Sequence, residues 1–203
     1  MRSIELTWCL AAALLTLHAW SEDGVAGKPE DAKGLAVGDR VPAVTVKQAD
    51  GKEVNLAEAI KAKPALLIFY RGGWCPFCHR HLAALQEIAG ELEKAGYQIL
   101  AVSPETPEDL PKTAEKSKAG YTLLSDTSLA ASKAFKLAFK MDDATIEKYK
   151  KYKFDLSAHH WILPAPAVYV VGTDGKIAFA HVNPDYKSRL DNAAILAAAK
   201  KPE

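Results

Sequence analysis

The sequence has little cysteine, little methionine and no excess of charge of either sign. Its 203 residues include three cysteines and two methionines, and 26 basic residues stand against 25 acidic ones, for a formal net charge of +1. The charges are mixed along the chain and form no basic stripe to neutralise a phosphate backbone, so a nucleic-acid partner is not expected. Three cysteines are also too few for a framework of several long-range disulfides.

Hydrophobic runs long enough to cross a bilayer are missing too, and a shorter run lies near the start. Arg2 precedes an apolar run over 6–17, and small residues follow at Ala19 and Ser21. This pattern predicts a secretory signal peptide over 1–21, because the run is too short to cross a bilayer comfortably. We therefore expect a periplasmic or secreted protein without stable membrane insertion. A retained N-terminal anchor is the less favoured alternative.

Removal of this leader would leave only two cysteines. Cys9 lies within the leader, so the mature chain would keep Cys75 and Cys78, in the stretch RGGWCPFCHRH over 71–81. These two can pair only with each other, and a bridge closing so short a loop constrains the unfolded chain little. The pair is therefore better interpreted as chemical than as structural.

Strands and helices are predicted to alternate after a polar segment over 22–38, which is expected to be a linker into one domain over 39–203. Apolar runs over 64–70 and 97–103 predict buried strands. Turn signals at Asp50-Gly51 and in GTDG predict two hairpins. Helical patterns follow the cysteine pair and recur through the chain to its end. This order predicts an α/β fold with a central mixed sheet flanked by helices.

The stretch 139–160, FKMDDATIEKYKKYKFDLSAHH, fits this alternation poorly. Its centre is predicted to be helical, with Asp142 or Asp143 as the N-cap. We interpret it as a helical insertion lying over the domain, and expect a solvated, charged helix.

The sequence pattern predicts that the cysteine pair lies where a strand ends and a helix begins. Cys75 would then face free backbone N–H groups and the positive end of the helix dipole, which both favour the thiolate. Pro76 fits the first helical turn, where its missing N–H leaves no hydrogen bond unmade. Cys78 lies one turn on and on the apolar face, so it is expected to be more buried and less acidic. This asymmetry predicts that Cys75 attacks and Cys78 resolves.

Two other chemistries share this motif. Cys-x-x-Cys-His is the attachment pattern of c-type haem. The iron of such a haem also needs a distal ligand, often methionine, and the mature chain would keep only one methionine, Met141. A structural zinc site needs four ligands, and beyond His79 or His81 only the doublet His159-His160 is available. Haem, zinc and a binding module with idle thiols remain remote alternatives. Thiol redox chemistry without cofactor or metal is favoured.

The motifs together resemble a known family. A strand, RGGWCPFC opening a helix, and the late hairpin PAVYVVGTDGKI resemble the thioredoxin fold, and within it the peroxiredoxin-like proteins of the alkyl hydroperoxide reductase and thiol-specific antioxidant (AhpC/TSA) family. The resemblance runs from about Val37 to Ala199 and includes HVNPDYKSRL. Its most specific part is FYRGGWCPFC.

The resemblance implies that Cys75 is the peroxidatic cysteine and that Pro166 matches the cis-proline facing the cysteine pair in thioredoxin-like oxidoreductases. The sequence differs from the family pattern at two positions before Cys75, and one of these differences bears on peroxide binding. The family pattern Pro-x-x-x-Thr-x-x-Cys would place proline at 68 and threonine at 72, where this chain has Ile68 and Gly72. The threonine hydroxyl that holds peroxide and thiolate is therefore absent.

Several side chains are expected to support the thiol. Arg71 is a candidate for the stabilising positive charge, Arg189 is a weaker one, and Trp74 is expected to shield the sulfur. The doublet His159-His160 precedes the loop that carries the proline, so it is expected to come near the pair.

Three more side chains are given ordinary roles. His79 and His81 flank the helix and are expected to be solvated or to face a partner, and Tyr186 is expected to be structural.

Two mechanisms stay open. In the slightly favoured one, the Cys75 thiolate reduces a peroxide, becomes sulfenic acid and condenses with Cys78, and a thioredoxin-like or other dithiol donor then reduces the disulfide. In the other, Cys75 attacks a protein or small-molecule disulfide and Cys78 releases the mixed disulfide.

Overall fold

The computed structural model describes residues 24–152 and 155–200. The predicted signal peptide, together with Cys9, lies outside the described residues. Within those two ranges, no helix combines the length and the apolar character that a bilayer crossing requires.

A seven-stranded mixed sheet forms the centre of the domain, in the order β2-β1-β5-β4-β3-β8-β9. Its strands are β1 (Thr45–Lys47), β2 (Glu53–Asn55), β3 (Ala65–Phe69), β4 (Gln98–Ser103), β5 (Thr122–Ser125), β8 (Ala167–Val171) and β9 (Ile177–Val182). β3, β4 and β5 run parallel, whereas β1–β2 and β8–β9 are antiparallel pairs. The predicted α/β fold with its central mixed sheet is confirmed, and both hairpins form where the turn signals placed them.

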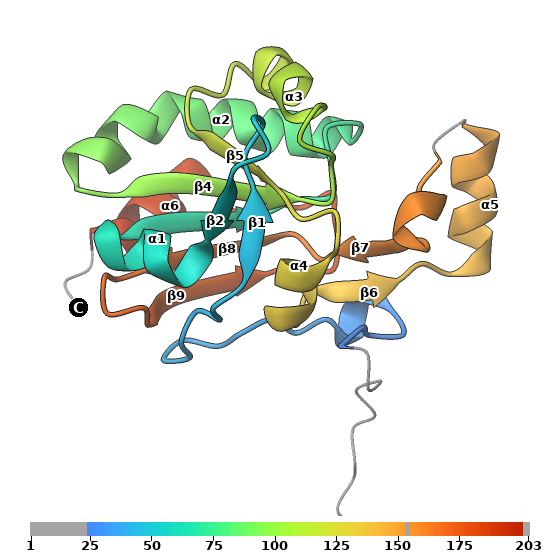
Figure 1. Cartoon of the computed structure of the whole chain (residues 1–203), viewed down its shortest axis with the longest axis horizontal. Coiled ribbons are helices and arrows are strands. Elements are labelled where there is room, and N and C mark those ends of the chain that lie inside the picture. Colours follow the sequence, from blue (N-terminus) through green and yellow to red (C-terminus); the bar gives the residue numbers. More distant parts are fainter. Residues whose placement is uncertain (1–23, 153–154, 201–203) are drawn as a thin grey trace, which may run out of the picture.

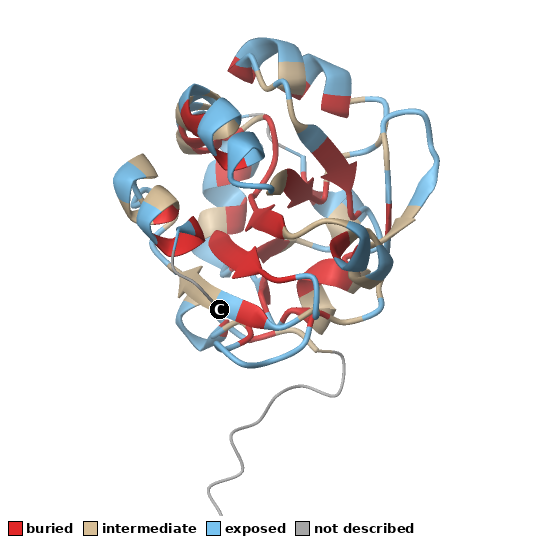
Figure 2. Cartoon of the chain, turned by 90° about the vertical axis from the view of Figure 1, so that its left-hand side faces the viewer, coloured by how far each residue is buried: buried red, intermediate tan, exposed pale blue. Residues whose placement is uncertain are grey.

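Helices cover both faces of this sheet. They are α1 (Leu56–Ala62), α2 (Pro76–Lys94), α3 (Leu110–Ser117), α4 (Ala130–Ala134), α5 (Asp143–Lys151) and α6 (Asn192–Ala199), with two short 3-10 turns at Pro29–Asp31 and Ser157–His159. β3 shows why two layers are needed: Leu66 and Ile68 pack toward α2 and α6, whereas Leu67 and Phe69 pack toward α1 and α4. Figure 2 shows the resulting pattern, with buried strands between helices that are buried on their inner faces.

The predicted insertion is helical at its centre. Asp142 is the N-cap of α5, and its carboxylate accepts a hydrogen bond from the Thr145 backbone N–H at 2.8 Å. A two-stranded ladder of β6 (Ala138–Lys140) and β7 (Ile162–Pro164) closes the insertion at its base. α5 projects to one side of the domain (Figure 1). It is not a fully solvated helix, however, because Ile146 and Tyr149 are buried.

The segment expected to be a linker lies against the domain over 24–38. The backbone of Ala26 exchanges hydrogen bonds with Ala138 and Lys140, at 2.8 and 2.9 Å. Further along, the Leu35 N–H donates to the Tyr169 hydroxyl at 3.2 Å, and Leu35 is itself buried. The polar composition hid this role, since the segment buries only three small or apolar side chains, Ala26, Ala32 and Leu35, and leaves Val37 exposed.

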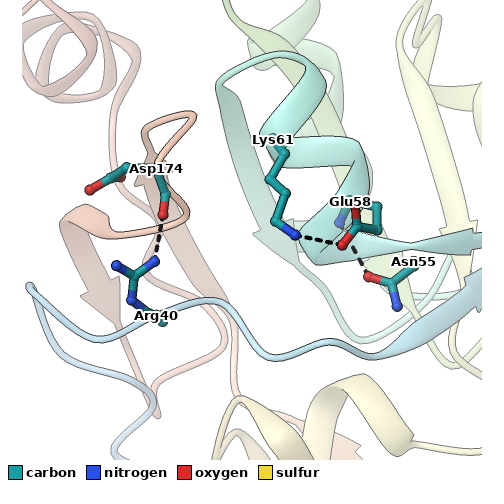
Figure 3. A network of polar contacts seen from close by, with 5 residues as sticks. All are labelled: Arg40, Asn55, Glu58, Lys61 and Asp174. Carbon is teal, nitrogen blue, oxygen red and sulfur yellow. Dashed lines mark hydrogen bonds and ion pairs between the residues drawn. The ribbon is translucent and has the colours of Figure 1, made fainter.

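Polar contacts at the surface join the segment before β1 to the β8–β9 turn and stabilise the start of α1 (Figure 3). Arg40 donates to the backbone carbonyl of Asp174 in the β8–β9 turn at 2.7 Å. Asn55 caps α1 by accepting from the Glu58 N–H at 3.2 Å, and Lys61 pairs with the Glu58 carboxylate at 2.7 Å. The cap is the more valuable of these contacts, because exposed ion pairs contribute little to stability.

A glycine pair tests whether 24–38 belongs to the folded domain. Gly34 has φ +71°, and an added Cβ would lie 2.5 Å from the Tyr169 hydroxyl and 2.6 Å from a Val182 methyl; Gly38 has φ +93° with no atom within 4 Å of an added Cβ. We expect Gly38→Ala to cost about 1–2 kcal/mol of backbone strain, and Gly34→Ala about 1–3 kcal/mol more through the clash. Urea unfolding midpoints measure both. Equal losses would show that the segment does not pack as described.

Candidate active site

The turn between β3 and α2 places Cys75 at the start of a helix. Cys75 is the N-cap of α2, its N–H bonds to the Gly72 carbonyl at 3.1 Å, and its own carbonyl accepts from Cys78 and His79 at 3.0 and 3.1 Å. Pro76 occupies the first turn, as the sequence predicts. Both thiols are reduced and almost completely buried, with Cys75 1% and Cys78 0% exposed.

The two thiols differ in acidity. Hydrogen bonds from the thiol and the backbone N–H of Cys78 lower the pKa of Cys75 to about 6 against the opposing effect of burial, with help from the charges of Arg71 and Arg189. Burial raises the pKa of Cys78 well above its ordinary value, and the neighbouring Cys75 raises it further. At neutral pH the pair therefore holds one thiolate, at Cys75, and one thiol, at Cys78.

Arg71 is buried in a cage of aromatic rings. It is 3% exposed, and its guanidinium carbon lies 5.1, 5.7 and 4.0 Å from the ring centres of Trp74, Tyr149 and Tyr186. Its Nη2 donates a hydrogen bond to the Tyr149 hydroxyl, while Nε and Nη1 are buried without a hydrogen-bond partner among the described residues. The cage holds a full positive charge close to Cys75, in the position where it favours a thiolate.

Arg189 lies beside the second cysteine of the pair. Its Nη2 lies 3.6 Å from the Cys78 sulfur, and its Nη1 donates to the Ser188 carbonyl at 2.9 Å. The weaker of the two arginine candidates is thus brought to the cysteines across 111 residues of sequence, and the charges of Arg71 and Arg189 both act on Cys75.

Gly72 and Trp74 together leave no room for a threonine. Gly72 has φ +135°, and an added Cβ would lie 2.5 Å from the indole Nε1 of Trp74. The Trp74 ring is half-buried and stands edge-on to Tyr149, with the ring centres 5.5 Å apart. The indole therefore occupies the space that the side chain of a larger residue at 72 would take.

The resemblance matches Pro166 by position, and the sequence leaves the isomer of its peptide bond open. Every described peptide bond is trans, including the one before Pro166. Pro166 lines a small cavity together with His81, His181 and Arg189.

The histidine doublet differs from expectation. His159 lies beside Asp126 and Thr127, in the loop between β5 and α4, and the His160 N–H bonds to the Ser157 carbonyl at 2.8 Å. These contacts place His159 beside the β5–α4 loop, and neither of them is with a cysteine. No group of three or more potential metal-ligating side chains occurs among the residues that the structure describes.

Sequence reasoning missed three side chains of the site. Tyr149 and Tyr186 enclose Arg71, and His81 is buried rather than solvated, with its pKa lowered to about 4 by burial and by the nearby Arg189 and His181. His81 lies three residues after Cys78 on one helix face, which is a local signal for its burial. No comparable signal marks the two tyrosines, because neither is near Arg71 in sequence.

Comparison with known proteins agrees with this geometry. The AhpC/TSA family model matches residues 37–180. The chain belongs to the AhpC/TSA family. The predicted resemblance, and with it the peroxiredoxin-like thioredoxin fold, is confirmed.

Individual relatives cover less of the chain. Peroxiredoxin Bcp of Escherichia coli is 36% identical over 92 residues, which are 45% of this chain and 58% of that protein. Chloroplastic peroxiredoxin Q of Gentiana triflora is 35% identical over 92 residues, or 42% of its length. The chain thus matches only about half of the length of these curated relatives.

Solved structures share the fold over most of the chain. Reduced Prx3 of Vibrio vulnificus in complex with hydrogen peroxide has a TM-score of 0.68 at 21% identity, over 82% of this chain and 99% of that one. Peroxidoxin BcpB of Mycobacterium tuberculosis has a TM-score of 0.63 at 19% identity, over 82% and 97%.

The acidity of Cys75 can be measured directly. We expect the thiolate absorbance of the reduced protein near 240 nm to rise with a midpoint near pH 6, because above the Cys75 pKa of about 6 the thiol is deprotonated. Arg71→Gln should move the midpoint up by about one pH unit, since an opposite charge is lost. Arg80→Gln, an exposed arginine on the same helix, is the matched control and should leave it unchanged. A midpoint near 8.5 in the unaltered protein would contradict the described geometry.

Proposed function

We propose that this chain is a thiol-dependent peroxidase in which Cys75 reduces a hydroperoxide and Cys78 resolves the product. The observation that carries the proposal is the paired environment of the two sulfurs. Cys75, with a pKa of about 6, is the nucleophile at the start of α2, and Cys78 stays protonated one turn away. Membership of the AhpC/TSA family supports this division of roles.

The reaction uses the pair in two steps. The Cys75 thiolate attacks the distal oxygen of the peroxide, a sulfur–oxygen bond forms, and the oxygen–oxygen bond breaks with its electron pair on the leaving oxygen, which takes up a proton. Cys78 then displaces the hydroxyl of the sulfenic acid, which leaves as water, and the disulfide forms. A dithiol donor restores both thiols by exchange and is itself oxidised.

Burial of the pair favours a small oxidant. Cys75 is 1% exposed, its chain neighbour Trp74 packs edge-on to Tyr149, and Tyr149 lies close enough to Cys75 to interact with it electrostatically. A hydroperoxide needs a much smaller opening than the loop of a protein that presents a disulfide. The similarity to peroxiredoxin Bcp, and to a peroxiredoxin solved with hydrogen peroxide, supports the same substrate class.

Thiol–disulfide exchange is the second candidate function. The Cys-x-x-Cys spacing suits a dithiol oxidoreductase, and Gly72 deprives the site of the threonine hydroxyl that the family pattern provides. Both functions use Cys75 as the nucleophile, so the oxidant that reacts faster distinguishes them.

The donor and the compartment are part of the proposal. A thioredoxin-like protein is the expected class of donor, because its dithiol can enter the exchange step that the disulfide requires. Residues 1–21 have the basic start, short apolar run and small residues of an export signal, so we place the mature protein in the periplasm or outside the cell.

Stopped-flow kinetics on the reduced mature chain test the function, with Trp fluorescence as the signal. We expect hydrogen peroxide to oxidise the protein many times faster than it oxidises free cysteine. Cys75→Ser should abolish the fast phase, and Cys78→Ser should keep the first oxidation but stop at the sulfenic acid. A visible spectrum of the same sample tests the remote haem alternative.

The opposite pattern would reverse the ranking of the two functions. Oxidation by peroxide no faster than that of free cysteine, together with prompt reaction with a small disulfide, would identify a thiol–disulfide oxidoreductase.

A further inference from the structure

The residue three positions before Cys75 carries no hydroxyl for the proposed peroxidase reaction. In the family pattern a threonine three residues before the cysteine provides it, and here Gly72 stands in that place. The indole of Trp74 lies 2.5 Å from where a Cβ of residue 72 would be. A hydroxyl for the peroxide would therefore come from a residue other than 72.

A hydroxyl from the insertion contacts the turn that leads to Cys75. The Tyr149 oxygen accepts a hydrogen bond from Nη2 of Arg71, and its ring stands edge-on to Trp74 at 5.5 Å between centres. Both contacts are with residues of the turn that leads to Cys75. Tyr149 thus reaches the active site across 78 residues of sequence.

The fold holds this hydroxyl firmly. Tyr149 and Ile146 lie one turn apart on α5, and both are buried against the core that includes Phe69 and Leu163. Asp142 caps the start of the helix, and the β6–β7 ladder fixes its base. The phenol is consequently a preorganised group rather than a mobile side chain.

We propose that the Tyr149 hydroxyl is a catalytic residue that binds the peroxide beside Arg71, in the role of the missing threonine hydroxyl. This inference rests on the proposed peroxidase function. Arg71 contributes too, because its Nε and Nη1 are buried donors without a partner among the described residues, and peroxide oxygens are acceptors.

The protonation state suits this role. Burial raises the pKa of Tyr149 above its ordinary value, although the charge of Arg71 opposes the rise, so the phenol is neutral at pH 7. A neutral hydroxyl both accepts and donates hydrogen bonds, and the bond from Arg71 uses one of its lone pairs.

The hydroxyl acts on the leaving oxygen. As the Cys75 sulfur attacks the distal oxygen and the oxygen–oxygen bond breaks, negative charge develops on the proximal oxygen. The Tyr149 O–H donates a hydrogen bond to that oxygen, which takes a proton and leaves as water or an alcohol. A donor that is fixed before the reaction stabilises this charge more than mobile water does.

Tyr149→Phe is the direct test, because it removes the hydroxyl and keeps the ring on Trp74. We expect the second-order rate constant for hydrogen peroxide to fall about 100-fold, the lower end of the range for loss of one fixed donor to developing charge. The rate with 5,5′-dithiobis(2-nitrobenzoate), a disulfide without a peroxide oxygen, should stay within about twofold. Tyr152→Phe, an exposed tyrosine at the end of the same helix, is the matched control for both rates.

Three readouts separate the outcomes. An unchanged peroxide rate in Tyr149→Phe, in a protein whose unaltered form reacts fast, would overturn the inference and leave the proposed function standing. Equal losses with peroxide and disulfide, with a raised thiolate midpoint at 240 nm, would also overturn it, because Tyr149 would then only position Arg71. A slow peroxide reaction of the unaltered protein would instead count against the proposed function. Thermal unfolding of each variant confirms that the fold is intact.

Discussion

A guanidinium buried beside a thiolate is the interaction on which the rest of this site depends. Taking a charge out of water costs several kcal/mol unless close partners compensate it. For Arg71 the compensation comes from three aromatic rings, the Tyr149 hydroxyl and the thiolate itself. Those partners come from the turn before α2, from α5 and from the segment after β9. The site therefore forms only when these three parts of the chain, which are distant in sequence, are in contact in the fold.

The part of the site that could be predicted from the sequence is the part that neighbouring residues determine. A continuous apolar run predicts β3, and Pro76 with the spacing of Cys78, Leu82 and Leu85 predicts α2. Together these fix Cys75 at the helix start and Cys78 on the buried face. This placement predicts the direction of the difference in acidity, and hydrogen bonds from Cys78 and the charges of Arg71 and Arg189 add to it in the folded protein.

What could not be predicted depends on contacts between distant residues. The charged composition of α5 predicts a solvated helix, since only Ile146 and Tyr149 turn inward and nothing in their neighbourhood points to Arg71. His159 and His160 were expected near the cysteines because they precede Pro166, but the chain turns them toward the β5–α4 loop. The polar segment before β1 gave no local sign of its docking. In each case tertiary packing decides, and a single sequence carries that information only weakly.

The docking of the segment 24–38 has a consequence for the order of folding. The hydrogen bond from Leu35 to Tyr169 joins residues 134 positions apart. Closing so long a loop is entropically costly until β8 is already in the sheet, so the earliest described residues of the chain are among the last to be fixed. Native-state hydrogen exchange would then show this segment opening at lower free energy than β3 or β4, as a separate cooperative unit on an otherwise rigid sheet.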